Sequence, residues 1–197
     1  HHAQDQQETF FLRMIRGASI AGLASIRPHQ GRYIRPLLKI SKAAILEYLT
    51  HNKLSWRIDS TNEQDTYLRN AIRLHVLPSL RRCDARFEKN FDATLSHIQE
   101  TDLFIERLAT AAFKRILRMH NEELSIDIAL FFTEDVFLHH RLLLMWLCRE
   151  KVPFTPSTAL FNEIVRFLGN KGTTHQLTSH WFLVKRNGCV SLKKGTR

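Results

Sequence analysis

Apolar residues recur at every third or fourth position from about residue 86 to residue 119, and this spacing predicts one long α-helix. A helix of that length bridges two domains or forms the spine of a helical bundle. We therefore expect two domains, residues 1–85 and residues 86–197, with the long helix beginning the second. The predicted apolar stripe of this helix consists of Phe87, Phe91, Leu95, Ile98, Ile105, Leu108, Ala112 and Ile116.

Shorter helices are predicted ahead of the long one. Apolar spacing and capping residues favour helices at residues 5–16, 41–51 and 65–76. Pro78 is expected to break or redirect the chain, because proline cannot donate a backbone hydrogen bond. The side chains expected to face inward in the second and third of these helices are Ile45, Leu46, Tyr48, Leu49, Leu68, Ile72 and Val76.

The sequence changes character after the long helix. Alternating apolar and polar residues predict a strand at residues 124–128, and helices are predicted at 134–148 and 157–169. Asn187-Gly188 lies between two apolar runs and predicts a β-hairpin. The expected fold class is therefore mainly α with a small β component. Side chains expected in the core of this part include Phe137, Leu143, Trp146, Leu147 and Leu168.

The chain is strongly basic, with 29 Lys and Arg against 19 Asp and Glu and a formal net charge of +10. Residues 1–90 hold 15 basic and 8 acidic groups, a net +7, whereas residues 91–197 hold 14 and 11, a net +3. This balance favours a polyanion such as RNA as partner, although a solvated basic surface has the same composition. The residues expected to bind RNA are Arg32, Arg35 and Lys39, which lie around Tyr33 in an irregular stretch.

Other classes of protein are disfavoured. Cys83, Cys148 and Cys189 are far apart and form no C-x-x-C pair, which argues against a zinc site or a disulfide framework. The sequence shows no signal peptide and no apolar run long enough to span a membrane. We therefore expect a cytoplasmic protein with no membrane partner and no dedicated metal site.

Two carboxylates near the start of the chain are candidates for chemistry. Asp5 and Glu8 stand three residues apart on the first predicted helix and share one of its faces. Such a pair can hold an ammonium group or, together with His1, a metal ion, and it can also act as an acid–base pair. The alternative is that both carboxylates stabilise the helix N-terminus through its dipole.

Two arginines further along the chain form a second candidate. Arg69 and Arg73 are four residues apart on one helix face, after the turn-forming residues 59–62. Guanidinium groups placed in this way repel each other unless an anion, such as a phosphate or a carboxylate, lies between them. The alternative is a pair of solvated surface arginines.

Several motifs occur in order along the first 82 residues. Residues 1–9 and 12–23 are similar to H-H-x-D-D-Q-x-E-T and to L-R-x-x-R-G…G-L, and residues 35–38 read R-P-L-L. Residues 59–62 and 67–73 match D-x-(S/T)-N and Y-x-R-N-x-(I/F)-R. This set resembles the tRNA(Ile)-lysidine synthetase family of the PP-loop ATP pyrophosphatase superfamily. The rest of the chain is more loosely similar to the helical substrate-binding domain of that family.

The resemblance implies the helical C-terminal part of a PP-loop α/β domain, followed by a helical (α+β) substrate-binding domain that ends in a β-hairpin. It implies an ATP-dependent ligase that joins L-lysine to the wobble cytidine of tRNA(Ile) through an adenylated base, with ATP and Mg²⁺ as cofactors. By the same resemblance, Asp5 and Glu8 hold the ammonium groups of lysine, and Arg69 pairs with the lysine carboxylate or the adenylate. These three are the expected catalytic residues, and the expected substrate-binding residues are His1, His2, Gln6, Asn70 and Arg73.

The chain departs from the family's pattern at two places. Gln4 stands where the family usually has Asp, and the S-G-G-x-D-S loop that cradles the ATP phosphates is missing, since no Gly-Gly pair occurs. We therefore expect a fragment of the ligase that has no ligase activity by itself. The alternatives are a tRNA-binding module without catalytic activity, a structural basic domain, and a related PP-loop enzyme that thiolates tRNA cytidine. The last of these is expected to have paired cysteines.

Overall fold

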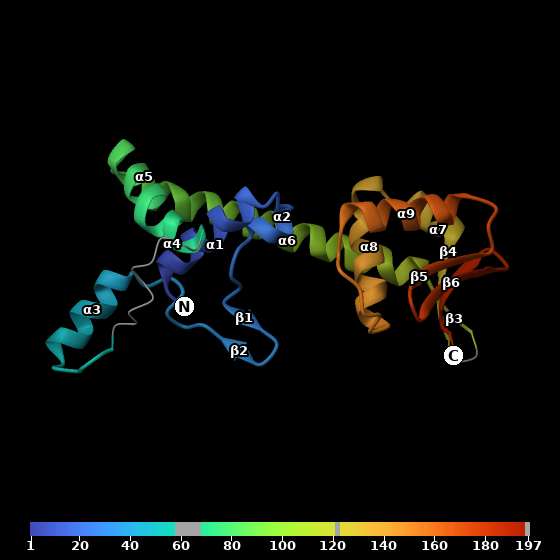
Figure 1. Ribbon diagram of the computed structural model, residues 1–197, viewed down its shortest axis with the longest axis horizontal. Helices are drawn as coiled ribbons and strands as arrows, with labels where there is room; N and C mark the ends of the chain where they lie inside the picture. The colour runs from blue at the N-terminus through green and yellow to red at the C-terminus, as the bar shows by residue number, and fades with distance from the viewer. Residues whose placement is uncertain (58–67, 121–122, 196–197) are drawn as a thin grey trace. The chain divides into compact units, whose positions relative to one another are not determined.

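The computed structural model describes residues 1–57, 68–120 and 123–195 (Figure 1). The chain forms two compact units, His1–Leu103 and Phe104–Arg197. The division between them lies within helix α6 (Phe87–Ile116), whose 30 residues confirm the long helix predicted from apolar spacing. The domain boundary expected between residues 85 and 86 stays a prediction.

The first unit is helical apart from one short β-hairpin. Phe10 and Phe11 of its first helix pack on Phe87 and Phe91 of α6, with ring centroids 5.2 to 6.5 Å apart. This aromatic contact holds the first helix, which carries Asp5 and Glu8, against α6. The other elements are α1 (Ala3–Ile15), α2 (Ile20–Leu23), β1 (His29–Gln30), β2 (Tyr33–Ile34), α3 (Lys42–His51), α4 (Leu68–Ala71), a π-helical segment (Ile72–Val76) and α5 (Leu77–Cys83).

Capping and periodicity located α1, α3 and the helical stretch of residues 68–76, but they did not predict α5 and did not identify every buried face. The Ser41 hydroxyl accepts a hydrogen bond of 3.1 Å from the Ala44 amide and begins α3 as expected. The expectation that Tyr48 faces inward is wrong, because its side chain is 64% exposed, and Leu68 and Val76 are exposed as well. Periodicity identifies an apolar face, but it does not say whether another element covers that face.

Pro78 does not end the helical path, so the break expected there is absent, while the redirection that it could cause instead stays a prediction. It lies in the first turn of α5, where a missing amide proton is tolerated. The π-helical segment Ile72–Val76 comes directly before α5. Proline cannot donate to the carbonyl four residues earlier, and the wider π turn accommodates this loss while the chain stays helical.

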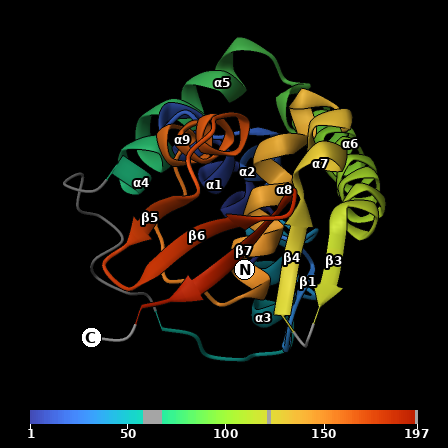
Figure 2. The ribbon, with the colours of Figure 1, turned by 90° about the vertical axis from the view of Figure 1, so that its right-hand side faces the viewer.

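The second unit is a five-stranded antiparallel sheet packed against helices (Figure 2). The strand order is β3-β4-β7-β6-β5, so the C-terminal hairpin lies in the middle of the sheet. Its elements are β3 (Leu117–His120), β4 (Glu123–Asp127), α7 (Ile128–Thr133), α8 (Val136–Arg149), α9 (Thr158–Gly169), β5 (Thr174–Thr178), β6 (Trp181–Arg186) and β7 (Cys189–Lys194). The expected fold class, mainly α with a small β component, is confirmed.

Some side chains expected in the core of the second unit are buried there, and others are exposed. Trp146 is fully buried together with Leu143 and Leu147, as expected. Phe137 and Leu108 were expected inside but are exposed. Strands β3 and β5 and helix α7 were not predicted. Strand β3 continues the apolar pattern of α6, and its strand conformation depends on pairing with β4.

The turn between β6 and β7 offers a test of local backbone geometry. Asn187 and Gly188 have φ values of 49° and 76°, as the predicted type of hairpin turn requires. A Cβ added at Gly188 meets no atom within 4 Å, so Gly188→Ala is expected to cost only backbone strain, about 1 kcal/mol in the free energy of unfolding. Hydrogen exchange of the amides in β6 and β7 measures this cost within the second unit. Gly169→Ala, at the end of α9 and without a positive φ, is the matched control, and an equal loss in both variants contradicts the strain argument.

Candidate functional site

Asp5 and Glu8 lie in the first turns of α1, on the side that faces the helices of residues 68–76. The side chain of Glu8 is 2% exposed and that of Asp5 is 15% exposed. The backbone amide of His2 donates a hydrogen bond of 2.8 Å to Asp5 Oδ2, which orients this carboxylate at the helix N-terminus. Part of the alternative interpretation of Asp5, stabilisation of the helix end, is therefore present in the structure.

Arg69 of α4 bridges the two carboxylates. Its Nη2 donates to Asp5 Oδ1 at 2.8 Å, and its Nε donates to Glu8 Oε2 at 2.7 Å. The three side chains meet although Arg69 follows the carboxylates by more than 60 residues in the sequence. The structure thus brings together the residues that the resemblance assigns to catalysis, while their role with lysine stays a prediction.

Arg73 completes a four-residue group, which we call the Asp5–Glu8 cluster: Asp5, Glu8, Arg69 and Arg73. Arg73 Nε and Nη2 donate to the two oxygens of Glu8 at 2.6 and 3.1 Å. The hydrogen bond with Glu8 raises the pKa of Arg73 above the ordinary arginine value, against the desolvation that lowers it. Glu8 is consequently a buried carboxylate held by two guanidinium groups, and a buried charge is stable only with such partners.

The cluster is open to solvent on its basic side. The side chains of Arg69 and Arg73 are 42% and 32% exposed, whereas the carboxylates beneath them are nearly covered. A ligand therefore meets the guanidinium groups first and reaches Asp5 more readily than Glu8. Two carboxylates and two guanidinium groups balance in charge within the cluster.

The remaining expected substrate residues differ in their contacts in the structure. His1 is exposed, and Asn70 is buried in α4. The ring of His2 lies 3.7 Å from Asp5 through Nε2, and within the described residues its buried Nδ1 has no hydrogen-bond partner. The amide of Gln6 binds the backbone of Ile26 at both ends, at 2.8 and 3.0 Å, so this side chain holds the segment after α2 in place. Direct contact of these four residues with a substrate stays a prediction.

The residues expected to bind RNA lie in one stretch of the first unit. Arg32 and Lys39 are exposed, and Arg35 is half-buried with its Nη1 donating to the carbonyl of Arg27 at 2.9 Å. Residues 59–62 and Tyr67, which also belong to the expected motifs, lie outside the described residues. Gln4, the departure from the family's pattern, accepts a hydrogen bond of 2.8 Å from the amide of Lys42 and so connects α1 to the start of α3.

Sequence reasoning missed a second polar network on α1. Gln7 is 1% exposed, and its Oε1 accepts a hydrogen bond of 3.0 Å from Arg81, while its Nε2 donates to Glu88. Arg81 Nε in turn donates to Glu88 at 2.5 Å. The network joins α1 to α5 and α6 and so holds the candidate site from behind. No local sequence pattern predicts this network, because its members are separated by up to 81 residues.

The described residues offer little to a metal ion or to ATP phosphates. They contain no group of three or more His, Cys, Asp or Glu side chains placed to hold a metal. A phosphate-cradling loop needs glycines between a strand and the N-terminus of a helix. In the part of the chain that the structure describes, the seven glycines lie elsewhere, within helices, at helix ends or in turns between other elements. The described residues therefore contain no glycine-rich phosphate loop.

No helix among the described residues has the length and apolar character needed to cross a lipid bilayer.

Comparisons with known proteins agree with the motif pattern. Residues 1–80 match the family of PP-loop domains. The tRNA(Ile)-lysidine synthase of Bacillus anthracis is 31% identical over 175 residues, which cover 85% of this chain and 37% of that protein. That of Geobacillus kaustophilus is 35% identical over 76% of this chain and 33% of its own length, and that of Treponema denticola is 37% identical over 53% and 23%.

The chain spans about a third of the length of the first two of these relatives. The similarity nevertheless runs through both compact units in the longer matches, and it includes the residues that carry the motifs. The family expected from the sequence is confirmed: this chain belongs to the PP-loop family that includes the tRNA(Ile)-lysidine synthases.

Proposed function

We propose that this chain supplies the lysine-binding residues and part of the tRNA-binding surface of a tRNA(Ile)-lysidine synthase. The observation that carries the proposal is the bridge from Arg69 to both Asp5 and Glu8, at 2.8 and 2.7 Å. The names of the relatives support tRNA(Ile) as a substrate, and lysine as the second substrate belongs to the proposal. ATP and Mg²⁺ as cofactors of the whole enzyme, and its cytoplasmic location, belong to the same proposal.

Lysine enters the Asp5–Glu8 cluster by exchanging ion pairs. One of its two ammonium groups takes the place of the Arg69 guanidinium on Asp5, the more exposed of the two carboxylates. The released donors of Arg69 then bind the carboxylate of lysine in the bidentate geometry that guanidinium favours. One ion pair is replaced by two, and Glu8 keeps both of its hydrogen bonds from Arg73 throughout. The cluster thereby orients the amino acid, which is what ligation requires of it.

Replacing Asp5 tests the lysine site. Asp5→Asn is expected to weaken binding of L-lysine about tenfold or more, because a charge-assisted ion pair is lost. Calorimetric titration of the 197-residue chain at low ionic strength measures the change. Glu47→Gln, an exposed acidic residue on α3, is the matched control and is expected to bind as the unaltered chain does. Unchanged lysine affinity in Asp5→Asn overturns the proposal.

The basic stretch of residues 32–39 is the proposed RNA contact. Arg32→Gln is expected to weaken tRNA binding and to lower the slope of log affinity against log salt concentration by about 1, the effect of one lost phosphate contact. Filter binding over a range of salt concentrations gives the slope. Lys171→Gln, exposed in the second unit, serves as the control. If the two variants change the slope equally, the RNA contact is not specific to this stretch.

A further inference from the structure

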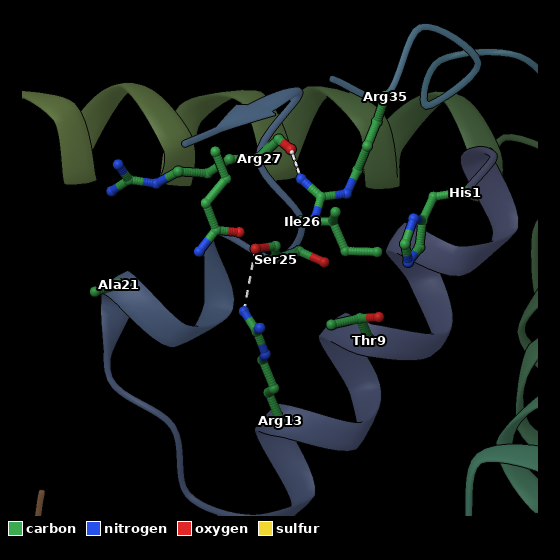
Figure 3. A pocket seen from close by; sticks show the side chains of 9 residues that line it. His1, Thr9, Arg13, Ala21, Ser25, Ile26, Arg27 and Arg35 are labelled. Carbon is green, nitrogen blue, oxygen red and sulfur yellow. Dashed lines mark hydrogen bonds between the residues drawn. The ribbon is translucent and has the colours of Figure 1, made fainter. Parts of the chain in front are cut away.

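Apart from the Asp5–Glu8 cluster, the first unit contains a polar pocket of about 420 Å³. It is lined from α1, from α2 and the segment that follows it, and from the segment around the short hairpin (Figure 3). The titratable residues of its lining are arginines and His1, and its neutral polar lining includes Thr9 and Ser25. The arginines are Arg13, Arg27 and Arg35.

The charges of these arginines are not equally balanced. Arg27 Nη2 forms an ion pair of 2.8 Å with Asp102, whose side chain is 2% exposed. Arg13 Nη1 donates to the carbonyls of Gly22 and Ser25 at 2.7 and 3.1 Å, and Arg35 Nη1 donates to the carbonyl of Arg27. Carbonyl groups hold a guanidinium in place, but they do not neutralise its charge. Among the described residues, no carboxylate lies within ion-pair distance of Arg13 or Arg35.

The pocket is therefore a preformed site with surplus positive charge. Figure 3 shows Arg13 rising from α1 and Arg35 descending from the segment after β2, with Ser25 and Ile26 between them. Both side chains are half-buried and fixed by hydrogen bonds, so binding an anion costs little side-chain entropy. Each guanidinium keeps further N–H donors beyond these hydrogen bonds, in the fork geometry that matches an oxyanion.

We infer that this pocket binds a phosphate group, held by Arg13 and Arg35 with Gln30 and Thr9 also in the lining. The phosphate group belongs to an RNA backbone or to a free nucleotide, which present the same chemistry to the two guanidinium groups. The inference deepens the proposed function and rests on it for the biological source of the phosphate. The pocket differs from the Asp5–Glu8 cluster in its expected ligand, because the cluster contains two carboxylates and the lining of the pocket contains none.

The experiment titrates the 197-residue chain, without lysine, with three probes at low ionic strength: inorganic phosphate, AMP and a short single-stranded oligoribonucleotide. Arg35→Gln is expected to weaken binding of all three about tenfold, since a charge-assisted contact is lost. Arg35→Lys, which keeps the charge but not the fork, is expected to fall between Arg35→Gln and the unaltered chain. Arg16→Gln, an exposed arginine at the end of α1 that does not line the pocket, is the control and is expected to change little.

The outcomes separate this inference from the proposed function. Tighter binding of AMP than of the oligoribonucleotide identifies a free nucleotide as the source, and the reverse order identifies an RNA strand. Absence of binding for all three probes, or equal weakening in Arg35→Gln and Arg16→Gln, overturns the phosphate site. Lysine titration of the unaltered chain, carried out in parallel without phosphate, reports on the Asp5–Glu8 cluster alone.

Discussion

Glu8→Gln is expected to lower the free energy of unfolding of the first unit by about 3 kcal/mol. The Glu8 carboxylate is buried and accepts hydrogen bonds from both Arg69 and Arg73. Removing one partner of a buried ion pair costs about 3 to 5 kcal/mol, because the other charge loses its compensation. The two guanidinium groups are partly exposed and regain some hydration, which places the loss at the lower end of this range.

Hydrogen exchange of the amides in α1 and α4 measures this loss within the first unit. A single unfolding curve cannot do so, because the chain has two units and the curve does not separate them. The matched control is Glu47→Gln, which makes the same chemical change on an exposed face of α3. We expect faster exchange in Glu8→Gln and no change in Glu47→Gln. Equal protection in the two variants would show that the buried ion pairs contribute nothing to stability.

Trp146→Ala is expected to have the largest effect in the second unit, a loss of about 4 kcal/mol in the free energy of unfolding. The Trp146 side chain is fully buried in the core of this unit, among residues of α7, α8, α9 and the sheet. Truncation to alanine removes its apolar surface from that core and leaves a large cavity. Hydrogen exchange of the amides in α8 and β6 measures the loss within the second unit.

Trp146→Phe separates the contribution of packing from that of polarity. The buried Nε1 of Trp146 has no hydrogen-bond partner within the described residues. Phenylalanine removes this unsatisfied donor, which by itself stabilises the fold, while it keeps most of the aromatic volume. The loss in Trp146→Phe is therefore expected to be well below half of that in Trp146→Ala. Similar losses in the two variants contradict this assignment and indicate that the indole nitrogen has a partner.

The features that the sequence alone determined are those encoded within one or two helical turns. Apolar spacing predicted α6, the hydroxyl of Ser41 predicted the start of α3, and Asn187-Gly188 predicted the hairpin. The spacing of Asp5 and Glu8 likewise placed two carboxylates on one helix face. The order of the motifs indicated the family, because that order is a property of the chain and needs no coordinates.

The tertiary structure decided every feature that depends on the path of the chain. Arg69 reaches Asp5 across 64 residues, and Arg27 reaches Asp102 across 75, at distances that no local pattern encodes. Strand β3 follows an apolar helix without a break in pattern and becomes a strand only through its pairing with β4. Tyr48 has the position of a buried residue on its helix and is nevertheless exposed. Hydrogen bonds within a turn need only residues that are close in the sequence. Ion pairs between distant residues, and burial, require a second segment of the chain to be folded alongside the first.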